Sequence, residues 1–199
     1  PALIIGAFAE RMKFSGFLAF SVFWMLLVYC PIAHWMWSTD GWLARAGALD
    51  FAGGAVVHIN AGIAALAAAY VIGRRRNIKA YPPHNLTHTM VGAAMLWFGW
   101  FGFNGGSALA ANGIAANAIL VTHAAASVAT LSWLVLDWLI YRRPTLLGAA
   151  TGAIAGLAAI TPAAGYVDFP GALVIGLVSG VLCYLMVMVV KPRVRYDAA

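Results

Sequence analysis

A single histidine inside an apolar segment is the residue of this sequence best suited to chemistry. His58 follows Asp50 by eight positions in the run 49–60, LDFAGGAVVHIN. If a helix begins near Asp50, a rise of about 1.5 Å per residue places His58 about 12 Å below the outer end of a hydrocarbon layer about 30 Å thick. A buried imidazole is favoured in its neutral form, with one ring nitrogen donating and the other accepting. We therefore expect His58 to line a path for a small polar solute, and the alternative is a core histidine bonded to a neighbouring helix.

A carboxylate stands at the expected outer end of the same segment. Asp50 could accept hydrogen bonds from the free backbone N–H groups at the start of the helix, where the helix dipole also favours a negative charge. It could in addition lie beneath an outer vestibule and raise the local concentration of a cation without contacting it. The sequence leaves both roles open, and they are compatible.

Aromatic side chains gather near the expected outer ends of two further apolar segments: Trp35, Trp37, Trp42, Trp100, Phe101 and Phe103. Most of them should be anchors at the membrane–water interface, where Trp is common. The expected topology also brings Trp37, Phe103, Ser107 and Asp50 to the same outer level from three different helices. Ring faces and a hydroxyl acceptor can replace part of the water that a small cation loses. We therefore expect a cation vestibule at this level.

Other polar residues are weaker candidates. Asp137 precedes Arg142 and Arg143 by about one turn, which predicts an ion pair at the membrane interface. An intramembrane hydrolase would need a nucleophile beside a base, and Ser107 with His123 is the only plausible pair, without a nucleophile turn to support it. No Cys/His cluster has metal-ligand spacing. We therefore expect no enzymatic activity, no metal and no other cofactor.

The elements that position these residues are apolar helices. The sequence is 63% hydrophobic and 9% charged, and its mean hydropathy is +0.87, whereas soluble domains carry about 25% charged residues. A span needs about 20 apolar residues. Six stretches meet this length approximately, at 14–37, 50–73, 86–107, 114–141, 145–162 and 169–190. The composition therefore predicts an all-α, polytopic membrane protein embedded in a lipid bilayer.

Basic residues alternate between the connections of these six spans. Arg45 is alone in its loop, whereas the other eleven of the twelve Lys and Arg residues fall in every second connection or at the C-terminal end. These eleven are Arg11, Lys13, Arg74, Arg75, Arg76, Lys79, Arg142, Arg143, Lys191, Arg193 and Arg195. The positive-inside rule assigns them to the cytoplasm. Orientation therefore explains the net charge of +6 better than a nucleic-acid partner does.

Glycines recur at the spacing of close helix packing. Gly148, Gly152 and Gly156 repeat every fourth residue, and Gly176 and Gly180 have the same spacing. Because lipid gives little hydrophobic drive for helix association, small residues at this spacing let backbones approach closely. We expect these glycines to lie at helix–helix contacts.

Several blocks of sequence resemble one known family, in order and spacing. They are GAFAER (6–11), PIAHWMW (31–37), GALDFAGGAVVHIN (47–60), PHN (83–85), GWFGFNGGS (99–107) and LGAATGAIAG (147–156) followed by Thr161 and Pro162. The chain is similar to the ammonium transporter (Amt/Mep/Rh) family over nearly its whole length. Retention of both Trp37 and Ser107 resembles the Amt/Mep branch more than the Rh branch.

This resemblance implies an eleven-helix fold with an inverted repeat, assembled as a homotrimer with one pore per subunit. The chain would be a single transmembrane domain over residues 1–199, incomplete at both ends, from the end of the third helix to the ninth. It would lie in the plasma (inner) membrane. The 3–4, 5–6 and 7–8 loops and the C-terminal end would be cytoplasmic.

The resemblance also implies roles for particular residues. Trp37 and Ser107 would recruit ammonium, and Phe103 would form one of two gating rings. Leu96 and Tyr29 would line the pore, and His58 would be one of its twin histidines. The partner histidine and the second phenylalanine belong to helices outside the chain. Two alternatives remain: an Rh-like ammonia or carbon dioxide channel, and an ammonium sensor coupled to a cytoplasmic P-II-type signalling protein.

Overall fold

Helices form every regular element that the computed structural model describes, over residues 1–75 and 83–194. The all-α fold expected from the apolar stretches is confirmed. In chain order the elements are η1 (Ala2–Ala7), α1 (Phe14–Trp24), η2 (Met25–Tyr29), α2 (Cys30–Trp37), α3 (Trp42–Arg45), η3 (Gly54–Ile59), α4 (Asn60–Ile72), α5 (Leu86–Gly106), α6 (Gly113–Tyr141), α7 (Leu146–Ile160), α8 (Phe169–Leu185), η4 (Met186–Val190) and α9 (Lys191–Val194). The first is a 3₁₀ helix, and the other three η segments are π-helical turns.

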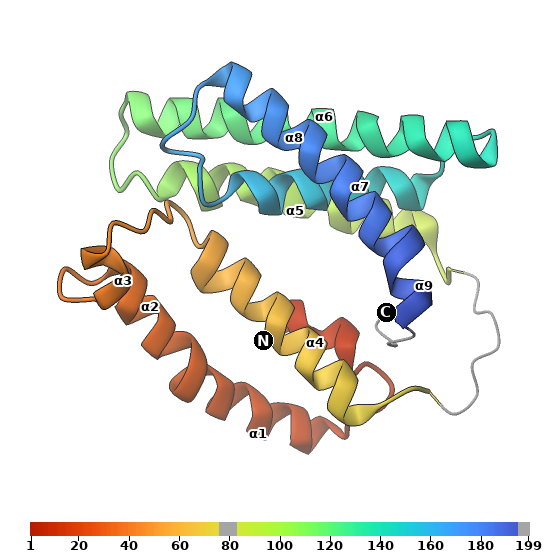
Figure 1. The fold of residues 1–199 in the computed structure, drawn as a ribbon, viewed down its shortest axis with the longest axis horizontal. Helices are drawn as coiled ribbons and strands as arrows, with labels where there is room; N and C mark the ends of the chain where they lie inside the picture. Colours follow the sequence, from red (N-terminus) through yellow and green to blue (C-terminus); the bar gives the residue numbers. More distant parts are fainter. Residues whose placement is uncertain (76–82, 195–199) are drawn as a thin grey trace.

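The helices form two groups that meet near the start of η3. One group holds α5, α6, α7 and α8, and the other holds α1, α2 and α4 with η1 (Figure 1). In the second group, η1 and α1 pack against α4 around the buried side chains of Ile4, Phe8 and Trp24. Contact between the groups includes that of η3 with α7. This junction contains the candidate site.

α6 is the central helix of the first group, and glycines bring its neighbours close to it. A Cβ on Gly156 of α7 would lie 2.6 Å from the carbonyl oxygen of Ala125, and one on Gly152 would lie 2.9 Å from that of Ala129. From α8, a Cβ on Gly180 would also lie 2.9 Å from the Ala129 oxygen. Two helices therefore touch the α6 backbone, and the predicted role of these glycines is confirmed.

Adding a single methyl group at this contact should destabilise the protein. Gly156→Ala places its Cβ against the rigid α6 backbone, so we expect the free energy of unfolding to fall by about 1–3 kcal/mol. Gly92→Ala on α5 is the matched control, because nothing lies within 4 Å of its Cβ position. That control should gain up to about 1 kcal/mol of helix propensity. Unfolding of the full-length protein in detergent measures both, and equal shifts would contradict the packing argument.

The helices differ in their capacity to cross a membrane. By length and composition, four segments of the described residues qualify: Phe14–Arg45, Gly54–Ile72, Gly113–Tyr141 and Phe169–Val194. Among the described residues, α7 is apolar but has only 15 residues, a rise of about 22 Å. α5 has 21 residues, but five Gly residues, one His and one Asn lower its hydropathy. The six predicted spans are all helical, and four of them meet the criteria for a span.

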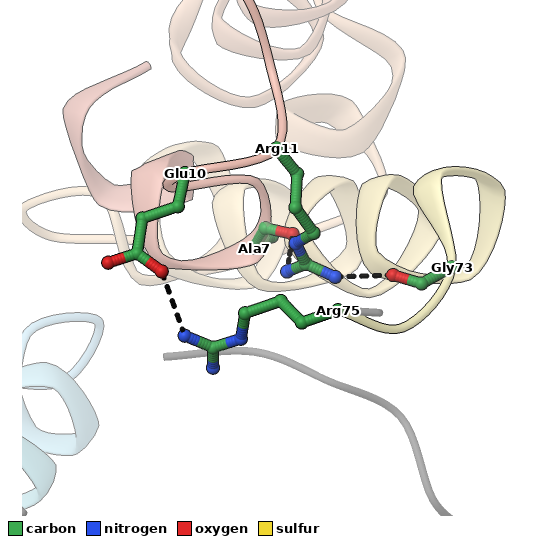
Figure 2. A network of polar contacts seen from close by, with 5 residues as sticks. All are labelled: Ala7, Glu10, Arg11, Gly73 and Arg75. Carbon is green, nitrogen blue, oxygen red and sulfur yellow. Dashed lines mark hydrogen bonds and ion pairs between the residues drawn. The ribbon is translucent and has the colours of Figure 1, made fainter. Parts of the chain in front are cut away.

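Charged side chains tie the first residues of the chain to the end of α4. The Arg11 guanidinium donates to the carbonyl oxygen of Ala7 at 2.6 Å and to that of Gly73, the residue that ends α4 (Figure 2). Arg75 pairs with Glu10 at 3.4 Å. These cations belong to the predicted cytoplasmic side. Three other members of that set, Arg76, Lys79 and Arg195, lie outside the described residues.

Asp137 does not form the predicted ion pair with Arg142 or Arg143. Its carboxylate is 3% exposed and accepts a hydrogen bond from the Thr145 hydroxyl at 2.6 Å. That hydroxyl in turn accepts from the backbone N–H of Gly148 at 2.9 Å. The prediction was wrong because the side chain points inward, to the start of α7, rather than toward the end of its own helix.

Candidate functional site

The Asp50 carboxylate holds the start of η3. Although only 6% exposed, it accepts four backbone hydrogen bonds. One oxygen accepts from Gly53 at 2.8 Å and Gly54 at 2.6 Å. The other accepts from Ala55 at 2.9 Å and Val56 at 3.0 Å. The expected capping role is confirmed, and an added electrostatic role toward a cation stays a prediction.

His58 lies in a π-helical turn and not in regular α-helix. Its backbone N–H donates to the carbonyl of Gly53, five residues earlier, at 3.1 Å. Gly53 has φ +107°, a conformation that a residue with a side chain rarely adopts. Such π turns recur at functional positions in helices. Here the turn widens the helix at the position that carries the imidazole.

The end of α7 is held against this turn. The Phe51 backbone N–H donates to the Pro162 carbonyl at 3.0 Å, and Gly54 packs so closely on the Pro162 ring that no Cβ would fit. This contact places Thr161 beside His58. The Thr161 Oγ1 lies 3.3 Å from Nε2 of His58.

Thr161 connects three helical segments through one hydroxyl group. Its side chain is fully buried. The oxygen accepts from Nε1 of Trp100 on α5 at 2.9 Å and donates to the Leu157 carbonyl on α7 at 2.7 Å. The His58 ring stacks on Trp100, with centroids 5.2 Å apart and planes inclined by 23°, and lies 6.0 Å from the Phe103 ring. His58 is therefore held by a hydrogen bond and two aromatic contacts.

Trp37 lies beside Asp50, Phe103 lies beside His58, and Ser107 lies one turn beyond Phe103. The Trp37 indole donates to the Asp50 carbonyl at 2.9 Å, and its side chain is 46% exposed. The Ser107 hydroxyl donates to the Phe103 carbonyl at 2.9 Å. Its oxygen lone pairs are then available to accept. Both residues present the groups that cation recruitment would require, and that role stays a prediction.

Two predicted pore residues are not part of the cluster around His58. Tyr29 packs 6.0 Å from the Trp24 ring, among the residues that join α1 to α4. Leu96 on α5 has a half-exposed side chain. Their pore-lining roles stay predictions.

The sequence did not identify Thr161 and Trp100 as site residues. Trp100 had been counted among aromatic residues expected mostly at the interface, but it is 8% exposed and its indole N–H is satisfied inside the protein. Thr161 entered only as part of a sequence block. Their positions in the sequence could have indicated a role, because Trp100 lies one turn before Phe103 and Thr161 follows the glycine-rich helix.

The Ser107 and His123 side chains make separate contacts. His123 on α6 packs against Trp97 and Phe101, with ring centroids 5.5 and 5.9 Å apart. Ser107 donates to its own helix. No hydrogen bond joins the two within the part of the chain that the structure describes. Among the described residues, no group of three or more His, Cys, Asp or Glu side chains could hold a metal ion.

Comparison with known proteins gives a consistent result. The profile of the Ammonium Transporter Family matches residues 1–199. The chain is 58% identical to ammonium transporter Amt1 of Archaeoglobus fulgidus over 186 residues, covering 92% of this chain and 47% of that protein. The crystal structure of Saccharomyces cerevisiae Mep2 matches with a TM-score of 0.93 and 41% identity, covering 100% of this chain and 46% of that one. A structure titled Sensor Amt Protein matches with a TM-score of 0.91 and 34% identity, covering 98% and 52%. The chain spans about half the length of the relatives it matches.

Proposed function

The chain belongs to the ammonium transporter family, and we propose that it forms the central part of a pathway carrying ammonium or ammonia across a membrane. Its family indicates an integral membrane protein, and so do the four helices, within the described part of the chain, that are long and apolar enough to span a membrane. We further propose a homotrimer in the plasma (inner) membrane, with the cation-rich connections in the cytoplasm. Residues 1–199 would be one domain of that protein.

Recruitment of the cation is the first proposed step. The exposed Trp37 ring offers a face for a cation–π contact, and the Ser107 oxygen offers an acceptor. The Asp50 carboxylate contributes negative charge nearby, although four N–H groups already occupy it. It would therefore act at a distance rather than as a ligand.

Loss of a proton is the second proposed step. An isolated ion in an apolar pore faces a desolvation cost of tens of kcal/mol, whereas a cation–π contact returns about 0.5 to 2 kcal/mol. Ammonium should therefore transfer its proton, near Phe103, to the neutral His58 imidazole, which passes it on to water before the next cycle. Neutral ammonia would then pass His58, which offers a hydrogen bond to a solute that has few others.

The observation that carries this proposal is the setting of His58. The ring lies beside Trp100 and Phe103, at a helix turn held by Asp50, with one nitrogen bonded to Thr161. Uptake of labelled methylammonium into vesicles containing the full-length protein, in competition with ammonium, tests the function. Uptake no greater than in empty vesicles would contradict it.

Removing the Trp37 ring should weaken selection for ammonium. Trp37→Leu abolishes a cation–π contact worth about 0.5 to 2 kcal/mol, so the preference for ammonium over a competing cation should fall about 2- to 30-fold. Competition of ammonium with methylammonium and potassium measures it. Trp42→Leu is the matched control, because Trp42 is 55% exposed and packs on Trp35 instead. Unchanged competition in Trp37→Leu would remove the recruitment role.

A sensor is a second candidate function, favoured by the likeness to the structure titled Sensor Amt Protein. A sensor would bind ammonium at the same outer residues and signal through inner connections, including 74–85, of which 76–82 lie outside the described residues. As a sensor, the protein would also bind a P-II-type signalling protein. Ammonium-dependent partner binding without uptake would favour the sensor, and uptake without it would favour transport.

A further inference from the structure

One hydroxyl group determines which nitrogen of His58 carries the proton. Three partners surround Oγ1 of Thr161: the Leu157 carbonyl oxygen at 2.7 Å, Trp100 Nε1 at 2.9 Å and His58 Nε2 at 3.3 Å. A hydroxyl group has one proton to donate and two lone pairs that accept. All three positions around the oxygen are therefore in use.

The direction of each bond follows from the chemistry of the partners. The Leu157 carbonyl has no proton, so a contact of 2.7 Å between two oxygens requires the Thr161 proton to lie between them. The Trp100 indole nitrogen is only a donor. His58 is the remaining partner, and its Nε2 must donate because the hydroxyl has no second proton.

We infer that Thr161 is a positioning residue that holds His58 as the Nε2–H tautomer, which leaves Nδ1 of the neutral ring as the bare acceptor. Trp100 contributes twice, because it fills one lone pair of Thr161 and stacks on the imidazole. This inference rests on the proposed function in one respect. If ammonia passes His58, Nδ1 is the atom that can accept its N–H or take a proton, and Nε2 is not.

The opposite tautomer is disfavoured by the same contacts. If Nε2 were the bare acceptor, the hydroxyl proton would have to rotate toward it and leave two oxygens facing each other at 2.7 Å. Thr161 is fully buried, so water cannot reach the two oxygens to form a hydrogen bond in place of the lost one.

Threonine variants separate this role from a structural one. Thr161→Val keeps the shape and removes the hydroxyl, whereas Thr161→Ser keeps the hydroxyl. Thr151→Val is the matched control on the same helix, because Thr151 makes the same bond to a carbonyl four residues back, also at 2.7 Å, away from the histidine. All variants are made in the full-length protein and compared at equal amounts of folded protein.

Solid-state nitrogen NMR of isotope-labelled histidine reads the tautomer directly, with the His58 signals assigned by their loss in His58→Asn. The wild type, Thr161→Ser and Thr151→Val should show a protonated Nε2 and a bare Nδ1. Thr161→Val should show a mixture of the two tautomers. A wild type with a protonated Nδ1 and a bare Nε2, or a Thr161→Val spectrum identical to wild type, would overturn the inference.

Uptake gives the functional readout. Thr161→Val should lower methylammonium uptake by about fivefold, the size expected for one lost hydrogen bond, and Thr161→Ser should restore most of it. Equal loss in Thr161→Val and Thr161→Ser would overturn the positioning role. A wild type without uptake that still shows the Nε2–H tautomer would overturn the proposed function while supporting the tautomer.

Discussion

Replacing His58 with alanine should reduce ammonium and methylammonium uptake by the full-length protein about 100-fold or more, with the fold intact. The imidazole is the polar group that packs against the Trp100 and Phe103 rings. Without it, a solute that has lost its water meets only aromatic and aliphatic surface, and a proton-transfer group worth about 10² to 10⁴ in rate is gone. Uptake into vesicles at matched protein content measures the loss.

His123→Ala is the matched control for this variant. His123 is also a membrane-helix histidine packed against two rings of α5, Trp97 and Phe101. Its replacement should leave uptake within about twofold of wild type, since surface side chains away from a site have small effects. Wild-type uptake by His58→Ala would defeat the pore assignment. Equal loss in both variants would indicate a general effect of removing a ring that packs against α5.

Replacing Asp50 with alanine should have the largest effect on stability. The carboxylate is buried and accepts four backbone N–H groups, which the variant leaves without an acceptor. A hydrogen bond to a charged group contributes about 1.5 to 3 kcal/mol, and these four share one side chain. We expect a loss of about 3 kcal/mol or more in the free energy of unfolding, measured by unfolding in detergent.

Asp168→Ala provides the comparison. Asp168 caps α8 through a single bond to the Gly171 N–H at 3.0 Å, and its side chain is exposed. That variant should cost about 0.5 to 2 kcal/mol, the usual range for an N-cap. An Asp50→Ala protein no less stable than Asp168→Ala would show that the four bonds contribute little.

Asp50→Asn tests the proposed action of the negative charge on the cation. The amide oxygen can keep part of the cap, but the charge is lost. If this variant folds, uptake at low ammonium should fall more at low ionic strength than at high, because salt screens the attraction in wild type. Equal uptake at every salt concentration would restrict Asp50 to its structural role.

Features that depend on one helix were accessible from the sequence. The six apolar stretches gave the helices, because the length of an apolar run is a local property. The spacing of Gly152 and Gly156 predicted that this face of α7 packs against another helix, and capping was one of the two roles predicted for Asp50 from its place before an apolar segment.

Features that depend on several helices could not be predicted from the sequence. Whether Trp100 faces lipid or protein depends on α7, whose Thr161 provides its acceptor. Asp137 likewise accepts a hydrogen bond from Thr145, which lies beyond the connection between α6 and α7, and does not pair with an arginine at the end of its own helix. The π turn at His58 depends on Gly53 and on the close contact of Gly54 with Pro162. The hydropathy of the sequence does not predict that contact.

The bonds at the two ends of the helix that carries His58 restrict how that helix can move. Asp50 holds its first turn, and Arg11 donates to the carbonyl of Gly73 at its last (Figure 2). Axial translation or rotation of η3 and α4 would break polar contacts at both termini. The depth of the imidazole in the bilayer is therefore nearly constant. If the proposed pathway opens and closes, we expect that change to come from side-chain rotation or from neighbouring helices, and not from displacement of α4 as a rigid body.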